Sequence, residues 1–317
     1  MKVIEHLEKA NDTIISFEII PPKRGGDLNQ LLSVLDVLSK YNPPFIDITS
    51  HAAEVIYEET NSGDFRVKVK RKRPGTLGIC ALIQHKYNID AVPHVICNGF
   101  TKEETEDFLI ELHYLGISNL LAIKGDNNAF QKPVSFGRSI NRYAVDLVKQ
   151  IDSMNKGVYL EDELLDASPT NFSVGIAGYP EKHFESPNLL TDLKYTKQKI
   201  DAGADYIVTQ MFYDNQKYFD YVKSARELGI EAPIIPGIKI LTSKSQLKSV
   251  PRNFYIDLPE ELIEEVMAAD DKHTADIGVE WAYKQVTELL DKGVPSVHFY
   301  VMQRSAPIKK LMKKLGF

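Results

Sequence analysis

The sequence predicts an α/β protein with a single domain, a (β/α)8 TIM barrel that spans residues 1–317. Short, nearly continuous apolar segments alternate with amphipathic helical segments along the whole chain. Eight such strand-then-helix units in about 300 residues are enough to close a barrel. No internal repeat, low-complexity tract or Gly/Ser linker marks a second domain.

The expected strands are short and rich in β-branched residues, as buried parallel strands are. They lie at 13–19, 45–50, 91–97, 119–125, 172–179, 205–212, 232–238 and 296–302. Helical patterns lie between them, and one begins with the capping-box spacing of Thr101 and Glu104. Gly116 and Gly203 stand where two of these helices are expected to end.

A doubly wound parallel sheet is the competing architecture for alternating strands and helices. Nucleotide-binding sheets of that kind carry a glycine-rich loop after a strand, and its backbone N–H groups hold the phosphates. The chain has neither GxGxxG nor GxxxxGK[ST]. Any nucleotide site must therefore be built in another way.

The composition excludes several function classes. The net charge of −6 argues against a general nucleic-acid binder, and no apolar run approaches the roughly 18 to 20 residues of a membrane span. The N-terminal residues lack the apolar stretch of a signal peptide. Cys80 and Cys97 offer no zinc-site spacing, so we expect no metal and a reducing, cytoplasmic compartment.

One segment departs from the acidic average of the chain. It is the run RVKVKRKRPG, which carries the basic residues Arg66, Lys68, Lys70, Arg71, Lys72 and Arg73. The alternation of Val67 and Val69 with basic residues is typical of an exposed strand or hairpin arm. Two interpretations stay open: a solvated surface segment, or a segment that binds a phosphate, such as part of a dinucleotide.

Polar residues follow or end the expected strands. They are Glu18, Thr49, Ser50, His94, Lys124, Gly125, Asp126, Tyr179, His183, Gln210, His298, Tyr300 and Arg304. In a barrel the carboxyl ends of all strands meet at one mouth, which is where active sites form. Burying so many polar groups together is costly without a ligand that satisfies them.

Glu18 is the sharpest catalytic candidate in this set. Its neighbours along the chain are Phe17, Ile19, Ile20 and Pro21. An apolar setting raises the pKa of a carboxyl group, so we expect Glu18 to stay protonated near neutrality. A protonated carboxyl at the mouth can act as a general acid.

The segments SFEIIPPK, DITSHA, VPHVIC, LLAIKGD, GIAGYPEKH, DAGADYIVTQMFYD, PIIPGI and HFYVMQR occur in this order. Together they resemble the methylenetetrahydrofolate reductase family from about residue 13 to the C-terminus. The resemblance implies a barrel that binds FAD without a Rossmann fold. It also implies two half-reactions: NADH or NADPH gives hydride to the flavin and leaves, and 5,10-methylenetetrahydrofolate then accepts the hydride. The product, 5-methyltetrahydrofolate, feeds methionine synthesis and one-carbon metabolism.

The resemblance also assigns roles. Glu18 would protonate the bridging folate nitrogen, Asp126 would sit between flavin and pterin, and Gln210 would contact both substrates in turn. Tyr300 and Arg304 would complete the substrate site, where Arg304 can pair with a carboxylate. The flavin-contacting positions would be Thr49, Ser50, Ala52, His94, Lys124, Gly125, Asp126, Tyr143, Ala144, Tyr179, His183, Asp192, Tyr195 and Lys199.

The sequence departs from the family pattern in several places. Lys124 replaces an arginine, Tyr195 replaces a frequent asparagine, and Lys244 stands where an aromatic residue commonly stacks on substrate. Residues 53–75 form an expected insertion that contains the basic run. The chain ends soon after the last strand, so we expect a short, bacterial-type enzyme without a regulatory domain. We also expect a homo-oligomer.

Three other functions compete with this one. A flavin barrel of the proline dehydrogenase kind would need paired arginines late in the chain, and only Arg304 is obvious. A folate-binding module without redox chemistry would lack flavin and its colour. A metal-dependent barrel hydrolase would need His-x-His or HExxH, and neither occurs.

Overall fold

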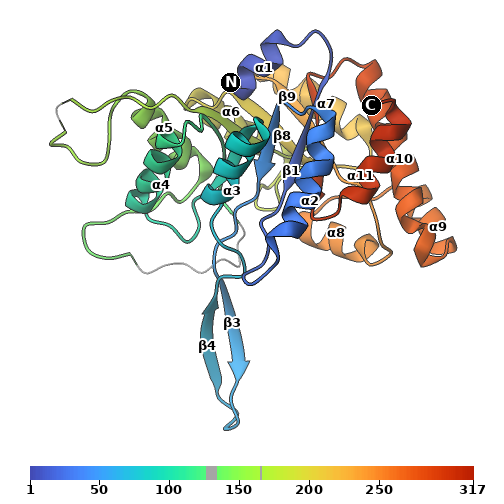
Figure 1. Ribbon diagram of the computed structural model, residues 1–317, viewed down its shortest axis with the longest axis horizontal. Helices are drawn as coiled ribbons and strands as arrows, with labels where there is room; N and C mark the ends of the chain where they lie inside the picture. The colour runs from blue at the N-terminus through green and yellow to red at the C-terminus, as the bar shows by residue number, and fades with distance from the viewer. Residues whose placement is uncertain (126–133, 165) are drawn as a thin grey trace.

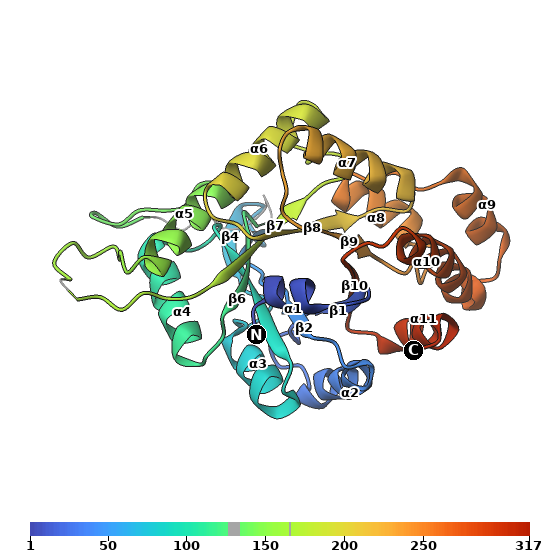
Figure 2. The same cartoon turned by 90° about the horizontal axis from the view of Figure 1, so that it is seen from above.

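The computed structural model describes residues 1–125, 134–164 and 166–317. Within them, eight parallel strands close into a barrel in the order β1-β10-β9-β8-β7-β6-β5-β2 (Figure 2). They are β1 (Ile14–Ile19), β2 (Phe45–Ile48), β5 (Asp90–Ile96), β6 (Asn119–Ile123), β7 (Ser173–Gly178), β8 (Tyr206–Met211), β9 (Ile234–Ile238) and β10 (Ser296–Met302). The predicted barrel is confirmed, and every strand lies within two residues of its predicted bounds.

Helices form the outer layer of the barrel (Figure 2). They are α2 (Leu28–Leu38), α3 (Leu77–Leu82), α4 (Lys102–Tyr114), α5 (Ala144–Asn155), α6 (Leu189–Asp201), α7 (Asn215–Glu227), α8 (Gln246–Phe254), α9 (Glu260–Ala268), α10 (Thr274–Asp291) and α11 (Ser305–Leu315). None of the helices in the described residues is long and apolar enough to cross a bilayer. The predicted capping box opens α4: Glu104 N donates to Thr101 Oγ1, and Thr101 N donates to Glu104 Oε2.

Two of the three apolar clusters in the described residues hold the layers of the barrel together. The larger one lies between the strands and the helices, and it includes Phe17, Leu35 and Ile46. A smaller one fills the barrel interior with Phe45, Val92, Leu121, Tyr206 and Ile235. Fully burying a side chain of this size stabilises the fold by roughly 1.5–3 kcal/mol. The barrel is therefore a packed core, and polar chemistry is confined to its ends.

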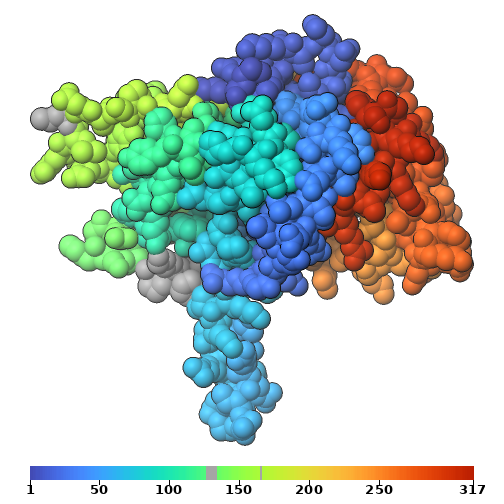
Figure 3. Space-filling model, in the orientation of Figure 1, coloured from blue at the N-terminus to red at the C-terminus, as the bar shows by residue number. Residues whose placement is uncertain are grey.

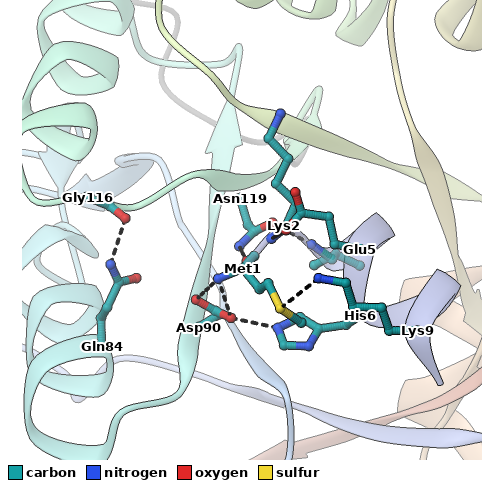
Figure 4. A network of polar contacts seen from close by, with 10 residues as sticks. Met1, Lys2, Glu5, His6, Lys9, Gln84, Asp90, Gly116 and Asn119 are labelled. Carbon is teal, nitrogen blue, oxygen red and sulfur yellow. Dashed lines mark hydrogen bonds and ion pairs between the residues drawn. The ribbon is translucent and has the colours of Figure 1, made fainter.

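The amino end of the barrel is closed by the short helix α1 (Val3–Lys9), drawn at the top of Figure 1. Asp90, the first residue of β5, accepts hydrogen bonds from the Met1 amino group at 2.9 Å and lies 2.6 Å from His6 Nε2 (Figure 4). The Asn119 amide accepts from Val3 N at 2.7 Å and donates to Met1 O at 2.9 Å. These polar groups fasten α1 across the opening.

An antiparallel hairpin of β3 (Glu54–Glu59) and β4 (Phe65–Lys70) projects from the opposite end of the barrel (Figures 1 and 3). The basic run therefore begins as the second strand of an exposed arm, as the alternation of valine and basic residues predicted. The turn is closed by a hydrogen bond from Thr60 N to Asp64 O. The hairpin leaves the barrel just after β2 and returns to it just before α3.

Candidate active site

Four titratable side chains meet inside the barrel at the carboxyl end of the strands. They are Glu18 of β1, Asp47 of β2, His94 of β5 and His298 of β10, and all are buried. Glu18 Oε2 lies 3.5 Å from His94 Nε2 and 3.8 Å from His298 Nε2. His94 Nε2 also lies 3.5 Å from Asp47 Oδ2. The group thus places one imidazole between two carboxylates.

The surroundings of Glu18 differ from the apolar setting that its sequence neighbours suggested. Phe17 and Ile19 belong to the outer apolar cluster, because alternate residues of a strand point to opposite faces. Glu18 instead faces the imidazoles inside the barrel. The expectation of an apolar environment was therefore wrong: adjacency along a strand says little about adjacency in space.

The carboxylates control the charge of His94. Burial alone lowers the pKa of this imidazole, but Glu18 and Asp47 outweigh it and hold the pKa above its usual value. Ser16 Oγ lies 2.8 Å from Nδ1 of the second imidazole, His298, which fixes the orientation of that ring. The cluster can therefore hold a proton close to Glu18.

From the sequence, His298 is one of the polar residues of the strands without an assigned role, and Asp47 is not singled out. A period of two along each strand is the signal that places both on the inner face. Asp47 lies two residues before Thr49, and His298 lies two residues before Tyr300. Residues with this spacing share one face of a strand.

Tyr300 and Gln210, two of the expected substrate-contacting residues, come from β10 and β8. The Tyr300 hydroxyl donates to Thr209 O at 2.5 Å, and Gln210 Oε1 accepts from Met211 N at 2.9 Å. Gly237 of β9 allows this arrangement, since a Cβ there would lie 2.3 Å from Thr209 O and 2.6 Å from the Tyr300 ring. Tyr300 is the residue of β10 that is paired with Glu18 in the parallel register.

A pocket of about 370 Å³ lies beside this cluster, between the carboxyl ends of β1, β9 and β10. Arg73, Lys239 and Arg304 all line it. Lys239 Nζ donates to Tyr300 O at 2.8 Å, and burial lowers the lysine pKa to about 8 although Glu18 opposes the shift. Arg73, at the end of the basic run, donates to Pro21 O. The pocket is therefore basic and suits a carboxylate or phosphate.

A second group of expected residues gathers around β6 and β7. Lys124 Nζ lies 2.7 Å from Glu185 Oε1, and it also lies 5.7 Å from the centre of the Tyr143 ring. The rings of Tyr179 and His183 meet edge to face, with centroids 4.7 Å apart. Ala144, another expected contact, begins α5 directly after Tyr143. The structure thus brings residues from three separate segments together.

Helix α6 adds Asp192, Tyr195 and Lys199 to this side of the mouth. Their spacing of three and four residues places them on one face of the helix. Lys199 Nζ donates to Ala177 O at 3.0 Å, and burial lowers its pKa to about 8 against the attraction of Asp192. Asp192 Oδ1 accepts from Ser186 Oγ at 2.7 Å. Tyr195 is 51% exposed at the edge of the group.

The remaining expected residues fall into three cases. Thr49, Ser50 and Ala52 follow β2 and lead into the hairpin, and Thr49 is buried. Gly125 ends the described segment after β6 with φ 89°, a conformation that favours glycine. Asp126 lies outside the described residues.

Lys244, which stands where an aromatic contact was expected, is directed away from the pocket. Its Nζ donates to Met267 O at 3.3 Å and lies 3.6 Å from Asp271 Oδ1, both outside the barrel. The neighbouring residues Thr242, Ser243 and Gln246 line the pocket instead. This loop therefore presents polar groups to the pocket.

Several buried polar atoms at the mouth have no hydrogen-bond partner among the described residues. They are both carboxylate oxygens of Asp47, Thr49 Oγ1, His94 Nε2, Asp192 Oδ2 and His298 Nε2. Each such atom costs about 1–3 kcal/mol when it stays unsatisfied. The carboxylates and imidazoles among them lie together at the carboxyl end of the barrel, which indicates a binding site for a polar ligand.

The chain is similar to known proteins over its whole length. The family model described as methylenetetrahydrofolate reductase matches residues 2–316. A 5,10-methylenetetrahydrofolate reductase of Pectobacterium carotovorum subsp. carotovorum is 28% identical over 304 residues, which cover 95% of this chain and 90% of that protein. Methylenetetrahydrofolate reductase 2 of Saccharomyces cerevisiae is 31% identical over 329 residues, which cover 100% of this chain and 50% of that protein. The chain spans about half the length of its curated eukaryotic relatives.

Solved structures support the fold. A protein from Clostridium thermocellum, described as binding two copies of 5-methyl-5,6,7,8-tetrahydrofolic acid, has a TM-score of 0.59 and 14% identity. The similarity covers 99% of this chain and 98% of that chain. At this identity the likeness concerns the barrel alone. The match to the family model is independent of this structural likeness. It shows that the chain belongs to the methylenetetrahydrofolate reductase family.

Proposed function

We propose that this protein reduces 5,10-methylenetetrahydrofolate to 5-methyltetrahydrofolate with NADH or NADPH, using bound FAD. The observation that carries the proposal is Glu18, a buried carboxyl group that lies between two imidazoles and next to a basic pocket. Relatives whose names include this reaction support it, and they differ in the nicotinamide that they name. The Clostridium protein that binds a methylated folate has the same fold, which also supports a folate ligand.

The residues around β6, β7 and α6 fit a flavin dinucleotide. Lys199 is a buried amine with one hydrogen bond to a backbone carbonyl, and Asp192 Oδ2 and Thr49 Oγ1 are buried and unsatisfied within the described chain. Lysines and hydroxyl groups are suited to the phosphates and the ribityl chain, and Tyr143, Tyr179 and His183 add aromatic surface. FAD, when bound, supplies a carrier that accepts hydride from the nicotinamide and delivers it to the folate.

In this proposal Glu18 acts as the general acid. Its proton passes to the bridging folate nitrogen N10, the bond between N10 and the methylene carbon breaks, and an iminium forms at N5. Hydride that originates from NADH or NADPH then converts the methylene carbon to the methyl group. One proton and one hydride are consumed for each folate, and Glu18 regains its proton from solvent through the mouth. General acids of this kind contribute roughly 10²- to 10⁴-fold.

The imidazoles position this proton. His94 is shared by Glu18 and Asp47, and its raised pKa keeps a proton 3.5 Å from the Glu18 carboxyl group. We therefore assign Asp47 and His94 as positioning residues for Glu18. Gln210 can donate to and accept from each substrate in turn, because a side-chain amide does both.

The basic pocket suits the acidic end of the folate. Arg304 and Arg73 both line it, and a guanidinium can bind a carboxylate through two parallel hydrogen bonds. The pocket can therefore hold the glutamate end of the folate while its pterin lies near Glu18.

Both cysteines are free and buried, which is consistent with a proposed reducing, cytoplasmic setting.

The test compares the wild type with Glu18→Gln in two anaerobic half-reactions. We expect nicotinamide oxidation to stay near the wild-type rate and folate reduction to fall by about 10²- to 10⁴-fold. Glu8→Gln is the matched control, because Glu8 is exposed on α1 at the other end of the barrel. Equal losses in both halves would mean that Glu18 supports the fold or the cofactor. Chromatography of the released cofactor identifies FAD, and a colourless protein would contradict the redox function.

A further inference from the structure

The hairpin β3–β4 has one side that exposes apolar side chains to solvent. In the antiparallel register Val55 is opposite Val69, Tyr57 is opposite Val67, and Glu59 is opposite Phe65. Directly opposed residues point to the same side of a two-stranded ribbon. Tyr57 and Phe65 are each 68% exposed, and Val67 is 59% exposed. We call the side formed by residues 55, 57, 65, 67 and 69 the apolar face; Glu59, opposite Phe65, lies on the same side at the end next to the turn.

The other side of the hairpin is mainly charged, with Ile56 opposite Lys68, and its acidic and basic side chains face one another. Glu54 is opposite Lys70, and Glu58 is opposite Arg66. Lys68 Nζ lies 3.2 Å from Glu58 Oε1 on this side. Residues 54–70 contain four acidic and three basic side chains, so the arm is almost neutral. A neutral arm is a poor match for nucleic acid or for an anionic membrane, which both select basic surfaces.

An isolated two-stranded hairpin is marginally stable at best in water. This arm therefore needs a surface that covers its apolar face. We propose that the surface is the apolar face of the same hairpin in a second copy of the chain, so that two arms pack face to face about a two-fold axis.

The distribution of charge selects this arrangement over edge-to-edge pairing. Strand β3 carries Glu54, Glu58 and Glu59, whereas β4 carries Arg66, Lys68 and Lys70. Pairing β3 with the partner's β3, or β4 with the partner's β4, places like charges side by side. Pairing β3 with the partner's β4 is heterologous and would continue into a filament. Face-to-face packing is isologous, closes at two copies and leaves the charged sides in water.

The size of the interface sets its strength. Each copy contributes two aromatic rings of roughly 150–250 Å², each about two-thirds exposed, together with its valines. The buried area is therefore at most roughly 1,000 Å² in total, below the ~1,200 Å² of standard specific interfaces and in the range of weak, transient ones. We expect a dimer that forms at tens of micromolar concentration and dissociates on dilution.

Sedimentation velocity over a concentration series tests the proposal, and the variant Tyr57→Ser with Val67→Ser makes the apolar face polar. We expect a concentration-dependent dimer for the wild type and a monomer for this variant. The matched control is Glu58→Ser with Lys68→Ser, which changes two residues on the charged side of the hairpin. This control should still dimerise. A wild type that is monomeric throughout, or a dimer that survives in the polar variant, would overturn the proposal.

A pair of single cysteines gives a second test that does not depend on destabilising the arm. Val67 and Lys68 are adjacent and both exposed, but they point to opposite sides of β4. With oxidised glutathione as the oxidant, Val67→Cys should form a covalent dimer and Lys68→Cys should not. The two native cysteines are buried and do not interfere. Equal cross-linking of the two variants, or none in either, would contradict face-to-face packing.

Discussion

The two ends of the barrel contain similar residue types in opposite states. At the amino end, Asp90 has the Met1 amino group and His6 as partners, and Asn119 uses both ends of its amide (Figure 4). At the carboxyl end, both oxygens of the buried Asp47 lack a hydrogen-bond partner among the described residues. The charged groups of the first end are paired within the chain, whereas the second end retains unsatisfied charged groups that a ligand can use.

This contrast separates stability from function within one fold. Substitutions at the amino end should change unfolding and leave the proposed reaction intact. Substitutions at the mouth should change binding or rate and leave unfolding similar or improved, because strained or unsatisfied active sites reduce stability. Three substitutions test the contrast, from the largest expected effect to the smallest.

Lys199→Met should weaken retention of the flavin most strongly. A hydrogen bond from a charged group is worth about 1.5–3 kcal/mol, which corresponds to roughly 10- to 150-fold in affinity. The flavin-free protein should not lose stability in parallel, because burial of the amine is itself costly. The measurement is the dissociation constant of FAD by fluorescence. An unchanged constant would remove Lys199 from the cofactor site.

The same lysine has a pH signature in the flavin-free protein. Its pKa is lowered to about 8 by burial, so between pH 8 and about 10 the unfolded chain binds more protons than the folded one. Stability from this group therefore rises with pH across that window. The rise should be absent in Lys199→Met.

Asp90→Asn should lower the free energy of unfolding by about 1–3 kcal/mol, since it leaves the Met1 amino group and His6 without their carboxylate. Burial raises the Asp90 pKa, but His6 and the amino terminus outweigh it and lower the pKa overall. The contribution is therefore present above the unfolded pKa of about 3.9 and is lost as pH falls through the folded value. Urea titrations at two pH values measure it, with the exposed Asp12→Asn as control.

Asp47→Asn should have the smallest effect on stability, a change of about 1 kcal/mol or less, because a buried carboxylate without hydrogen bonds contributes little. It should lower the pKa of His94, which loses one of its two carboxylate neighbours. A raised histidine pKa stabilises the fold below the unfolded value of about 6.5, and this contribution is lost as pH rises through the folded value. Proton NMR of the His94 ring gives its titration, and an unchanged pKa would separate Asp47 from the cluster.

The fold was predictable from the sequence because its signals are local. Continuous apolar runs predicted the barrel strands, and the pair Thr101 and Glu104 predicted the start of a helix. The alternation of valine with basic residues predicted strand β4 of the hairpin. Each of these signals depends on residues that are neighbours in the chain. Tyr179 and His183, which the family resemblance placed in the flavin-contacting set, do lie together at the mouth.

The chemistry of the site was less predictable because it depends on contacts between strands that are distant in sequence. Glu18 is separated by 76 positions from His94 in the sequence and lies 3.5 Å from it in the barrel, where only β2 stands between their strands. The apolar residues beside Glu18 in the chain concealed this environment. The apolar residues of the segment FIDI concealed Asp47 in the same way. Arg73 follows the hairpin in the sequence and lines the pocket. It meets the other pocket residues only because the barrel closes.

The most direct test of the contrast between the two ends is a set of anaerobic half-reactions on three proteins: the wild type, Glu18→Gln and Asp90→Asn. The account predicts that all three oxidise NADH or NADPH at similar rates. It predicts that the wild type and Asp90→Asn then reduce methylenetetrahydrofolate, while Glu18→Gln is slower by about 10²- to 10⁴-fold. If Glu18→Gln reduced the folate at the wild-type rate, or if Asp90→Asn failed below its unfolding temperature, the assignment of chemistry to one end and stability to the other would be contradicted.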